Sequence, residues 1–152
     1  EPHFKEETLV SSSLIRKRIL EGRVKEVIPL LTRPFFLEGT VVRGNRRGAR
    51  LGIPTANLKP VNELIPADGV YVTNSLLGRK KYRGVTNIGT NPTFGSGART
   101  IETNLFGFKK NIYGKKVRLL FLKRLRGEIR FFSKEALVRQ IKKDITKAKS
   151  RV

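Results

Sequence analysis

Two short stretches near the N-terminus carry apolar residues at helical spacing. Residues 11–13 are serines that precede the first stretch and can cap it through a hydroxyl. Gly22 is expected to end that helix, and Pro29 predicts that the second helix is short or bent. Composition and periodicity both change after residues 32–34, which we interpret as a boundary. The apolar positions are Leu14, Ile15, Ile19 and Leu20 in the first stretch and Val24, Val27, Ile28 and Leu31 in the second.

From residue 35 onward the pattern shortens to that of β-strands. β-Branched and aromatic runs are separated by turn residues such as Gly78 and the Asn91-Pro92 pair. No helical pattern lies between the runs, which favours an antiparallel sheet or small barrel, because a doubly wound sheet needs a helix in each crossover. The predicted strands cover residues 35–42, 69–77, 81–88, 100–108 and 116–125.

A helical pattern returns at the C-terminal end. Ser133 can cap this helix, and the helix is expected to pack on the barrel through one apolar stripe. The stripe consists of Leu137, Ile141, Ile145 and Ala148, with Arg139, Lys142, Lys143 and Lys147 facing outward.

The composition excludes several classes of chemistry. There is no cysteine, and His3 is the single histidine, so disulfides, thiolate zinc sites, cysteine nucleophiles and histidine-based triads are ruled out. No apolar run approaches the roughly 20 residues of a membrane span. The first residues also lack the basic and then apolar order of a signal peptide, so we expect a cytoplasmic protein.

Charge is the most unusual property of the chain. It has 33 Lys and Arg against 12 Asp and Glu, for a net charge of +21. Three explanations are open: nucleic-acid binding, attraction of a phosphorylated small substrate, or a missing part of the protein that carries the compensating acid. The cations are scattered along the chain, and neither an RNA-recognition aromatic motif nor a Gly-x-x-Gly clamp in a helical setting is present.

The long irregular segment 43–68 is the first candidate for chemistry. It opens with glycines at four-residue spacing, which let a backbone approach a ligand closely, and with arginines, which suit phosphate oxygens. The segment lacks the ending of a Walker A loop and the helix of a Rossmann fingerprint. It is interpreted either as a phosphate-binding loop or as an ordinary basic hairpin loop. Its candidate ligands are Gly44, Arg46, Arg47, Gly48, Arg50 and Gly52.

Thr55 and Asn57 follow this segment and offer a hydroxyl and an amide oxygen on the same side of an extended chain. Such neutral oxygens, together with nucleotide phosphates, are typical ligands of Mg²⁺. The alternative is a simple turn with Asn in a left-handed conformation. Glu102 lies within a predicted strand and could orient or deprotonate an alcohol, or it could pair with an arginine. Glu38 also lies in a strand, but nothing near it in sequence resembles a site.

Several segments, in order and spacing, resemble the riboflavin kinase family over residues 33–149. The part before them, residues 10–16, is similar to the final motif of the FMN adenylyltransferase domain that precedes the kinase in bacterial FAD synthetases. We therefore expect residues 1–32 to be the tail of that domain and residues 33–152 to be the kinase domain. The resembling segments are 39–44 (GTVVRG), 51–58 (LGIPTANL), 66–71 (PADGVY), 87–94 (NIGTNPTF), 101–103 (IET) and 122–126 (LKRLR).

The resemblance implies a mainly β fold, a six-stranded antiparallel Greek-key barrel with a C-terminal α-helix, plus a short N-terminal helical segment. It also implies transfer of a phosphoryl group from ATP to riboflavin, giving FMN and ADP, with Mg²⁺ as the metal and Zn²⁺ or Mn²⁺ as alternatives. Thr55 and Asn57 match ligands of the metal and ATP phosphates, and the 44–52 loop matches a flap over the nucleotide. Glu102 matches the catalytic base, while Arg126 and Phe131 match flavin contacts. Adenylyltransferase activity is not expected, because the histidine-rich nucleotide motif is missing.

The sequence departs from the family pattern on the flavin side. The family commonly has Leu-Arg-Pro-Glu-Lys and then Phe-Asp-Ser, whereas Arg126 is followed here by GEIRFFS. Gly127 should loosen this loop, and Ile129 cannot donate a charged hydrogen bond. Asn104 stands where many relatives have His. The competing hypothesis is a nucleic-acid-binding β-barrel whose arginines and C-terminal lysines follow phosphates.

Overall fold

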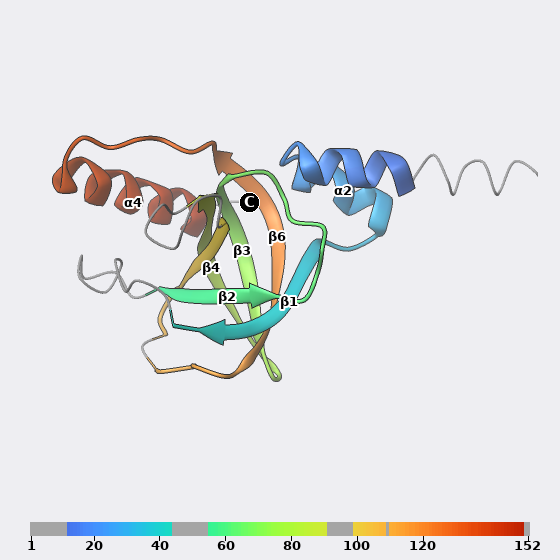
Figure 1. The fold of residues 1–152 in the computed structure, drawn as a ribbon, viewed down its shortest axis with the longest axis horizontal. Helices are drawn as coiled ribbons and strands as arrows, with labels where there is room; N and C mark the ends of the chain where they lie inside the picture. Colours follow the sequence, from blue (N-terminus) through green and yellow to red (C-terminus); the bar gives the residue numbers. More distant parts are fainter. Residues whose placement is uncertain (1–11, 44–54, 91–98, 109, 151–152) are drawn as a thin grey trace, which may run out of the picture.

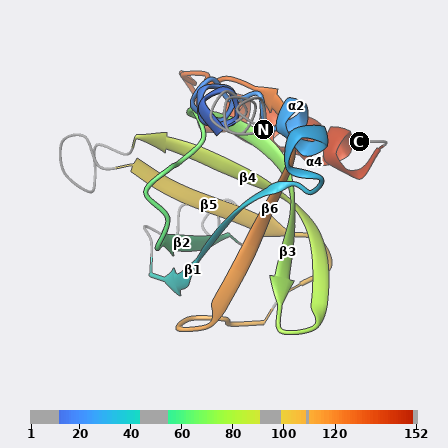
Figure 2. The same ribbon diagram turned by 90° about the vertical axis from the view of Figure 1, so that its right-hand side faces the viewer.

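The computed structural model describes residues 12–43, 55–90, 99–108 and 110–150. Six antiparallel strands form a closed barrel in the order β1-β2-β5-β4-β3-β6, with helices at one end (Figures 1 and 2). The mainly β barrel with a C-terminal helix and a short N-terminal helical segment is thereby confirmed. The strands are β1 (Phe35–Val42), β2 (Ala56–Pro60), β3 (Gly69–Leu77), β4 (Lys80–Thr90), β5 (Arg99–Leu105) and β6 (Lys116–Arg126).

The five strands predicted from periodicity are all present, with small differences at their ends. The prediction of strand through residue 108 was wrong, because β5 ends at Leu105 and a turn follows, in which Gly107 has φ +71° and the Phe108 amide donates to the Leu105 carbonyl at 3.4 Å. The short β2 lies within the segment that we expected to be irregular. Its pairing with both β1 and β5 closes the barrel.

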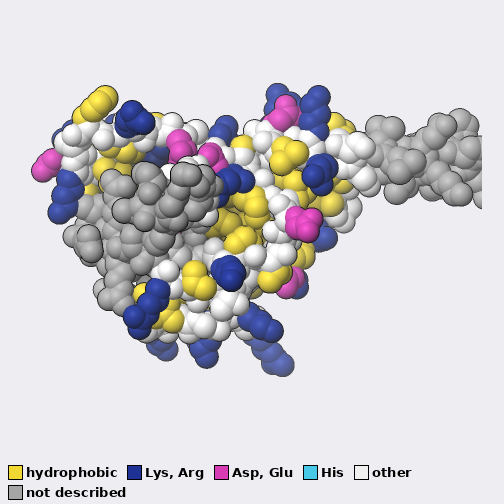
Figure 3. Space-filling view, in the orientation of Figure 1, with side chains coloured by type: hydrophobic (Ala, Val, Ile, Leu, Met, Phe, Trp, Pro, Cys, Tyr) yellow, Lys and Arg dark blue, Asp and Glu magenta, His cyan; other side chains and the backbone are white. Residues whose placement is uncertain are grey.

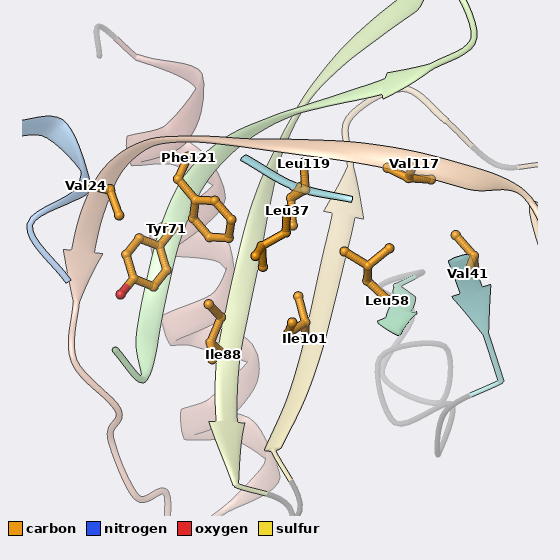
Figure 4. Packing of buried hydrophobic residues seen from close by; sticks show 10 residues of the cluster. All are labelled: Val24, Leu37, Val41, Leu58, Tyr71, Ile88, Ile101, Val117, Leu119 and Phe121. Atoms are coloured by element: carbon orange, nitrogen blue, oxygen red, sulfur yellow. The ribbon is translucent and has the colours of Figure 1, made fainter. Parts of the chain in front are cut away.

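Alternation of side chains along each strand fills the barrel with apolar groups. Tyr71 and Phe121 are fully buried, and their rings meet edge to face with centroids 5.2 Å apart. Figure 4 shows these two rings with the aliphatic residues around them. The aliphatic members of the cluster are Val24, Leu37, Val41, Leu58, Ile88, Ile101, Val117 and Leu119.

Three threonine hydroxyls cross the interior on neighbouring strands. Thr73 and Thr86 share a hydrogen bond of 2.8 Å, and Thr86 donates to Thr103 at 2.9 Å. Buried hydroxyls that bond to one another avoid the cost of leaving a polar group unpaired. The hydroxyls therefore link β3, β4 and β5 inside the barrel.

The N-terminal helices pack closely on the barrel. The first covers residues 12–20, Gly22 follows it as predicted, and α2 (Val24–Leu31) is short and contains Pro29. Ile19, Val24 and Val27 are fully buried, so these helices contribute apolar side chains to the barrel's end.

The C-terminal helix α4 (Lys134–Lys149) begins at the predicted cap, where the Ser133 hydroxyl accepts a hydrogen bond from the Ala136 amide at 3.1 Å. Of the predicted stripe, Ala148 is buried, while Leu137, Ile141 and Ile145 are only partly buried. The other buried residue of this helix is an acid, Asp144.

Candidate active site

A row of polar residues crosses three strands on the outer face of the barrel. Asn57 on β2 is the direct partner of Glu102 on β5, and Glu102 is the direct partner of Asn87 on β4. Their neighbours Leu58, Ile101 and Ile88 are buried in the core. Since successive side chains point to opposite faces, Asn57, Glu102 and Asn87 face outward together. Directly paired side chains have Cβ atoms about 5 Å apart, so the amide and the carboxylate are close neighbours.

The β2 side of this row offers neutral oxygen ligands. Thr55 stands immediately before β2 and is partly buried, and Asn57 is 9% exposed. No group of three or more His, Cys, Asp or Glu residues that could hold a metal occurs within the described ranges. A hydroxyl, an amide and a nearby carboxylate still fit Mg²⁺, which binds through a few protein oxygens together with phosphates and water.

Glu102 occupies the middle of the row and is partly buried. A carboxylate held on a strand has its backbone fixed by the ladders on both sides, which β2 and β4 supply here. Such a group can accept a proton or a hydrogen bond from an alcohol placed above the sheet. Its position between two amide side chains gives it polar neighbours on both strands.

The next outward pair on the same two strands is Gly89 on β4 with Thr100 on β5, roughly 7 Å from the Asn87–Glu102 pair. Glu128, which follows β6, lies directly on Gly89, where a Cβ added to the glycine would overlap the Glu128 Oε1. Burial raises the pKa of Glu128, and nearby Asp68 raises it further, while Arg126 and Arg99 oppose the shift. The segment after β6 therefore runs along the same outer face as Glu102.

This segment is tied to α4 by a buried ion pair. The Arg126 guanidinium donates from Nη2 to Asp144 Oδ2 at 2.8 Å and from Nε to both carboxylate oxygens at 3.2 Å. The two side chains are 17% and 3% exposed. Gln140 also donates to Asp144 at 3.1 Å, and Arg126 donates to the Gly127 carbonyl at 3.1 Å. The guanidinium lies 5.8 Å from the centre of the Phe131 ring.

Asp68 forms a second anchor at the same end of the barrel. Arg99, the first residue of β5, donates from Nε and Nη2 to Asp68 Oδ1 at 2.9 and 2.7 Å. Arg124 donates to the Asp68 carbonyl, and Tyr71 donates to the Ala67 carbonyl. Burial raises the pKa of Tyr71, against the influence of Arg124. These contacts fix the chain that leads into β3 against the strand that carries Glu102.

The structure brings together some of the residues predicted for the site. Asn57 on β2 pairs with Glu102 on β5, and Thr55 immediately precedes β2. Arg126, at the end of β6, lies over the ring of Phe131. The six predicted ligands of the 44–52 loop lie outside the described residues. They are Gly44, Arg46, Arg47, Gly48, Arg50 and Gly52.

Sequence reasoning missed three residues at this site. Asn87 could have been found from strand alternation once its pairing with Glu102 was known. Asp144 carries a signal in the sequence, since it lies three residues from Ile141 and four from Ala148 and so shares the face of the apolar stripe. Glu128 has no such signal, because its contact with Gly89 depends on the path of the chain after β6.

Comparison with known proteins shows which family the chain resembles. The flavokinase family model, described as riboflavin kinase, matches residues 31–152. A bifunctional riboflavin kinase/FMN adenylyltransferase of Buchnera aphidicola is 39% identical over 145 residues, and its counterpart in Bacillus subtilis is 38% identical over 139 residues. These matches cover 93% and 89% of this chain but 46% and 44% of the relatives. The chain therefore spans about half the length of the curated relatives it matches.

Two solved structures superpose on this chain. A Streptococcus pneumoniae protein described as a macrolide-efflux protein superposes with a TM-score of 0.82 at 43% identity, over 88% of this chain and 44% of that one. A riboflavin kinase from Trypanosoma brucei superposes with a TM-score of 0.53 at 25% identity, over 76% and 78% of the two chains. In the described part of this chain, no helix has the length and apolarity needed to span a membrane. The chain belongs to the riboflavin kinase family.

Proposed function

We propose that this chain is a riboflavin kinase, which transfers the terminal phosphoryl group of ATP to the ribityl 5′-hydroxyl of riboflavin and releases FMN and ADP. The observation that carries the proposal is the direct pairing of Asn57 with Glu102. This pairing places the Asn57 amide, which suits a phosphate or a metal ion, beside the Glu102 carboxylate, which can act on an alcohol. Family membership supports the same reaction.

The phosphoryl donor belongs on the β2 side of the row. Thr55 and Asn57 would hold Mg²⁺ and the ATP phosphates, and the arginines of the 44–52 loop would neutralise phosphate charge. Bound Mg²⁺ would supply charge neutralisation at the transferring phosphate. The identity of the metal stays a prediction, with Zn²⁺ and Mn²⁺ as the alternatives.

The acceptor alcohol belongs over Glu102. The carboxylate would orient the 5′-hydroxyl and take its proton as the oxygen attacks the phosphorus, while ADP leaves on the opposite side. Phosphoryl transfer requires little covalent participation by the protein, so alignment of donor and acceptor supplies most of the rate enhancement. Fixing Glu102 between two strands serves that alignment.

The flavin ring belongs along the segment after β6. Phe131 offers an apolar contact for the ring, and the pairing of Arg126 with Asp144 holds the start of the segment against α4. Because the Arg126 fork is already bonded to Asp144, we expect Arg126 to act by placing Phe131 and the backbone of Gly127.

The division of the chain at residue 32, and the origin of residues 1–32 in an adenylyltransferase domain, stay predictions. We expect no adenylyltransferase activity from this chain, since that activity belongs to the part of the bifunctional relatives that the chain does not match. Cytoplasmic residence likewise stays a prediction.

Incubation of the full chain with riboflavin and Mg-ATP tests the proposed function. Chromatography with flavin fluorescence should show FMN, and ADP should appear in equal amount. Omission of riboflavin should abolish ADP formation, which excludes a contaminating ATPase. Absence of FMN from a folded sample that binds ATP would contradict the proposal.

A further inference from the structure

The proposed kinase leaves the high positive charge of this chain unexplained. ATP needs only the few cations that surround its phosphates, and the residues assigned to it lie at β2 and in the loop before it. No Asp or Glu occurs between residues 69 and 101 or between 103 and 127. The strands β3, β4 and β6 and the turns at their far ends therefore carry positive charge alone.

The uncompensated charge gathers at one end of the barrel, which we call the basic end. The β3–β4 hairpin and the connection from β5 to β6 both lie at the end opposite the helices (Figures 1 and 2). Leu76 pairs with Lys81 on β4 and with Arg118 on β6, so the hairpin tip lies beside the start of β6. Lys and Arg side chains project from this edge in Figure 3. The basic end consists of Arg79, Lys80, Lys81, Lys110, Lys115 and Lys116, all exposed.

These six cations have no structural use in the described part of the chain. None of them is in an ion pair with another described residue, whereas the nearby Arg118 is paired with Glu38 at 2.9 Å. Six exposed like charges on adjoining turns repel one another, and this repulsion is relieved when an anion binds. The arrangement therefore fits a ligand with several negative charges spaced along its length.

We infer that the basic end binds the phosphate backbone of a nucleic acid, without reading its sequence. A protein partner normally needs an apolar centre within the interface. The large apolar side chains exposed near this end are Val42, Val61 and Tyr113, at 36%, 78% and 39%, and they come from three separate segments. The guanidinium of Arg43 lies over the Tyr113 ring at 5.6 Å. Charge without an apolar centre is typical of backbone binding, where phosphate contacts and released counterions supply the affinity. Lys80 and Lys81 lie seven and six residues from Asn87 along β4, so the hairpin part of this surface is distant from the row that contains Glu102. Lys115 is closer to the row, because its carbonyl bonds to Val41, the neighbour of Val42, which pairs with Asn57.

The test uses fluorescence anisotropy of the full chain with a labelled single-stranded RNA of about 20 nucleotides and mixed sequence, over a range of salt concentrations. The variant Lys80→Glu/Lys81→Glu/Lys116→Glu removes three cations of the basic end. The matched control Arg139→Glu/Lys142→Glu/Lys143→Glu makes the same change in net charge on the exposed side of α4. A neutral version, with Gln at positions 80, 81 and 116, replaces the first variant if that one does not fold.

Removal of three phosphate contacts should reduce the slope of log K against log salt by about 2, at about 0.7 per contact for a single strand. Binding at 100 mM salt should weaken at least tenfold, while the control changes it less than threefold. FMN formation should be unaffected in both variants. Equal weakening by the two variants would show that net charge alone attracts RNA and would overturn the inference. Competition by poly-L-glutamate as strong as that by unlabelled RNA would also overturn it.

Discussion

The two ends of the barrel differ in whether their positive charges are paired with acidic residues. At the end where β3 begins and β6 finishes, Arg99 and Arg126 are paired with Asp68 and Asp144, and the second pair is almost completely buried. At the basic end, the cations face solvent without acidic partners among the described residues. The first end uses arginines to hold chain segments in place beside the candidate active site. The second contributes charge that the fold itself does not use.

Removal of Asp144 is expected to lower the stability of the protein more than any other substitution considered below. Asp144→Ala leaves the Arg126 guanidinium largely buried without its counterion, and breaking such a pair costs about 3–5 kcal/mol. Urea unfolding should show this loss of stability. Glu38→Ala is the control, because both members of the Glu38–Arg118 pair are 47% exposed and an exposed pair contributes about 1 kcal/mol or less. Equal losses in the two variants would contradict the assigned difference between the pairs.

Two glycines in left-handed conformations differ in the space around them, one at each end of the barrel. Gly22 has φ +80°, and a Cβ there would lie 3.0 Å from Arg124 and from the Tyr71 hydroxyl. Gly78, in the hairpin of the basic end, has φ +60° and open space around it. Gly22→Ala should therefore cost about 2 kcal/mol, and Gly78→Ala about 1 kcal/mol for the backbone conformation alone.

Thermal or urea unfolding of the two glycine variants provides the measurement. A cost for Gly78→Ala equal to or above that for Gly22→Ala would show that Arg124 and Tyr71 do not pack tightly against the turn.

Substitution of Glu128 is expected to change stability least, and the size of the change should depend on pH. Its pKa is raised above the ordinary value of 4.5, so the folded protein holds the proton more tightly than the unfolded chain. Stability from this group is complete below pH 4.5 and is lost as pH rises through the raised pKa. Glu128→Gln should therefore raise the Tm slightly at pH 7 and leave it unchanged at pH 4. A lower Tm at pH 7 would show that the carboxylate stabilises the fold.

Periodicity predicted much of this fold because most strands have one buried face. In β1, Leu37 and Val41 are buried and alternate with more exposed neighbours, and the strand has the predicted ends. β2 has only five residues and ends at Pro60, which is too short for alternation to distinguish it from a loop. Its presence was expected only from the family resemblance.

The candidate site was predictable as a set of residue types but not as an arrangement. Thr55, Asn57 and Glu102 could be selected because hydroxyl, amide and carboxylate groups suit phosphoryl transfer. Their proximity depends on the register between β2 and β5, which brings together residues 45 positions apart in the chain. Asp144 was missed because its partner Arg126 lies on β6 rather than on α4, so the sequence around Asp144 gives no sign of an ion pair.

The turnover of Glu102→Gln, compared with that of Glu38→Gln, shows whether the Glu102 carboxylate acts on the acceptor alcohol. Both substitutions neutralise a carboxylate on a strand of the same barrel, but only Glu102 pairs with Asn57. The predicted kcat for FMN formation falls by roughly 10²–10⁴ in Glu102→Gln, as expected for loss of a general base, while the Kd for ATP is kept. Glu38→Gln should stay within about twofold of the parent. Wild-type turnover by a folded Glu102→Gln variant would show that Glu102 is not the general base.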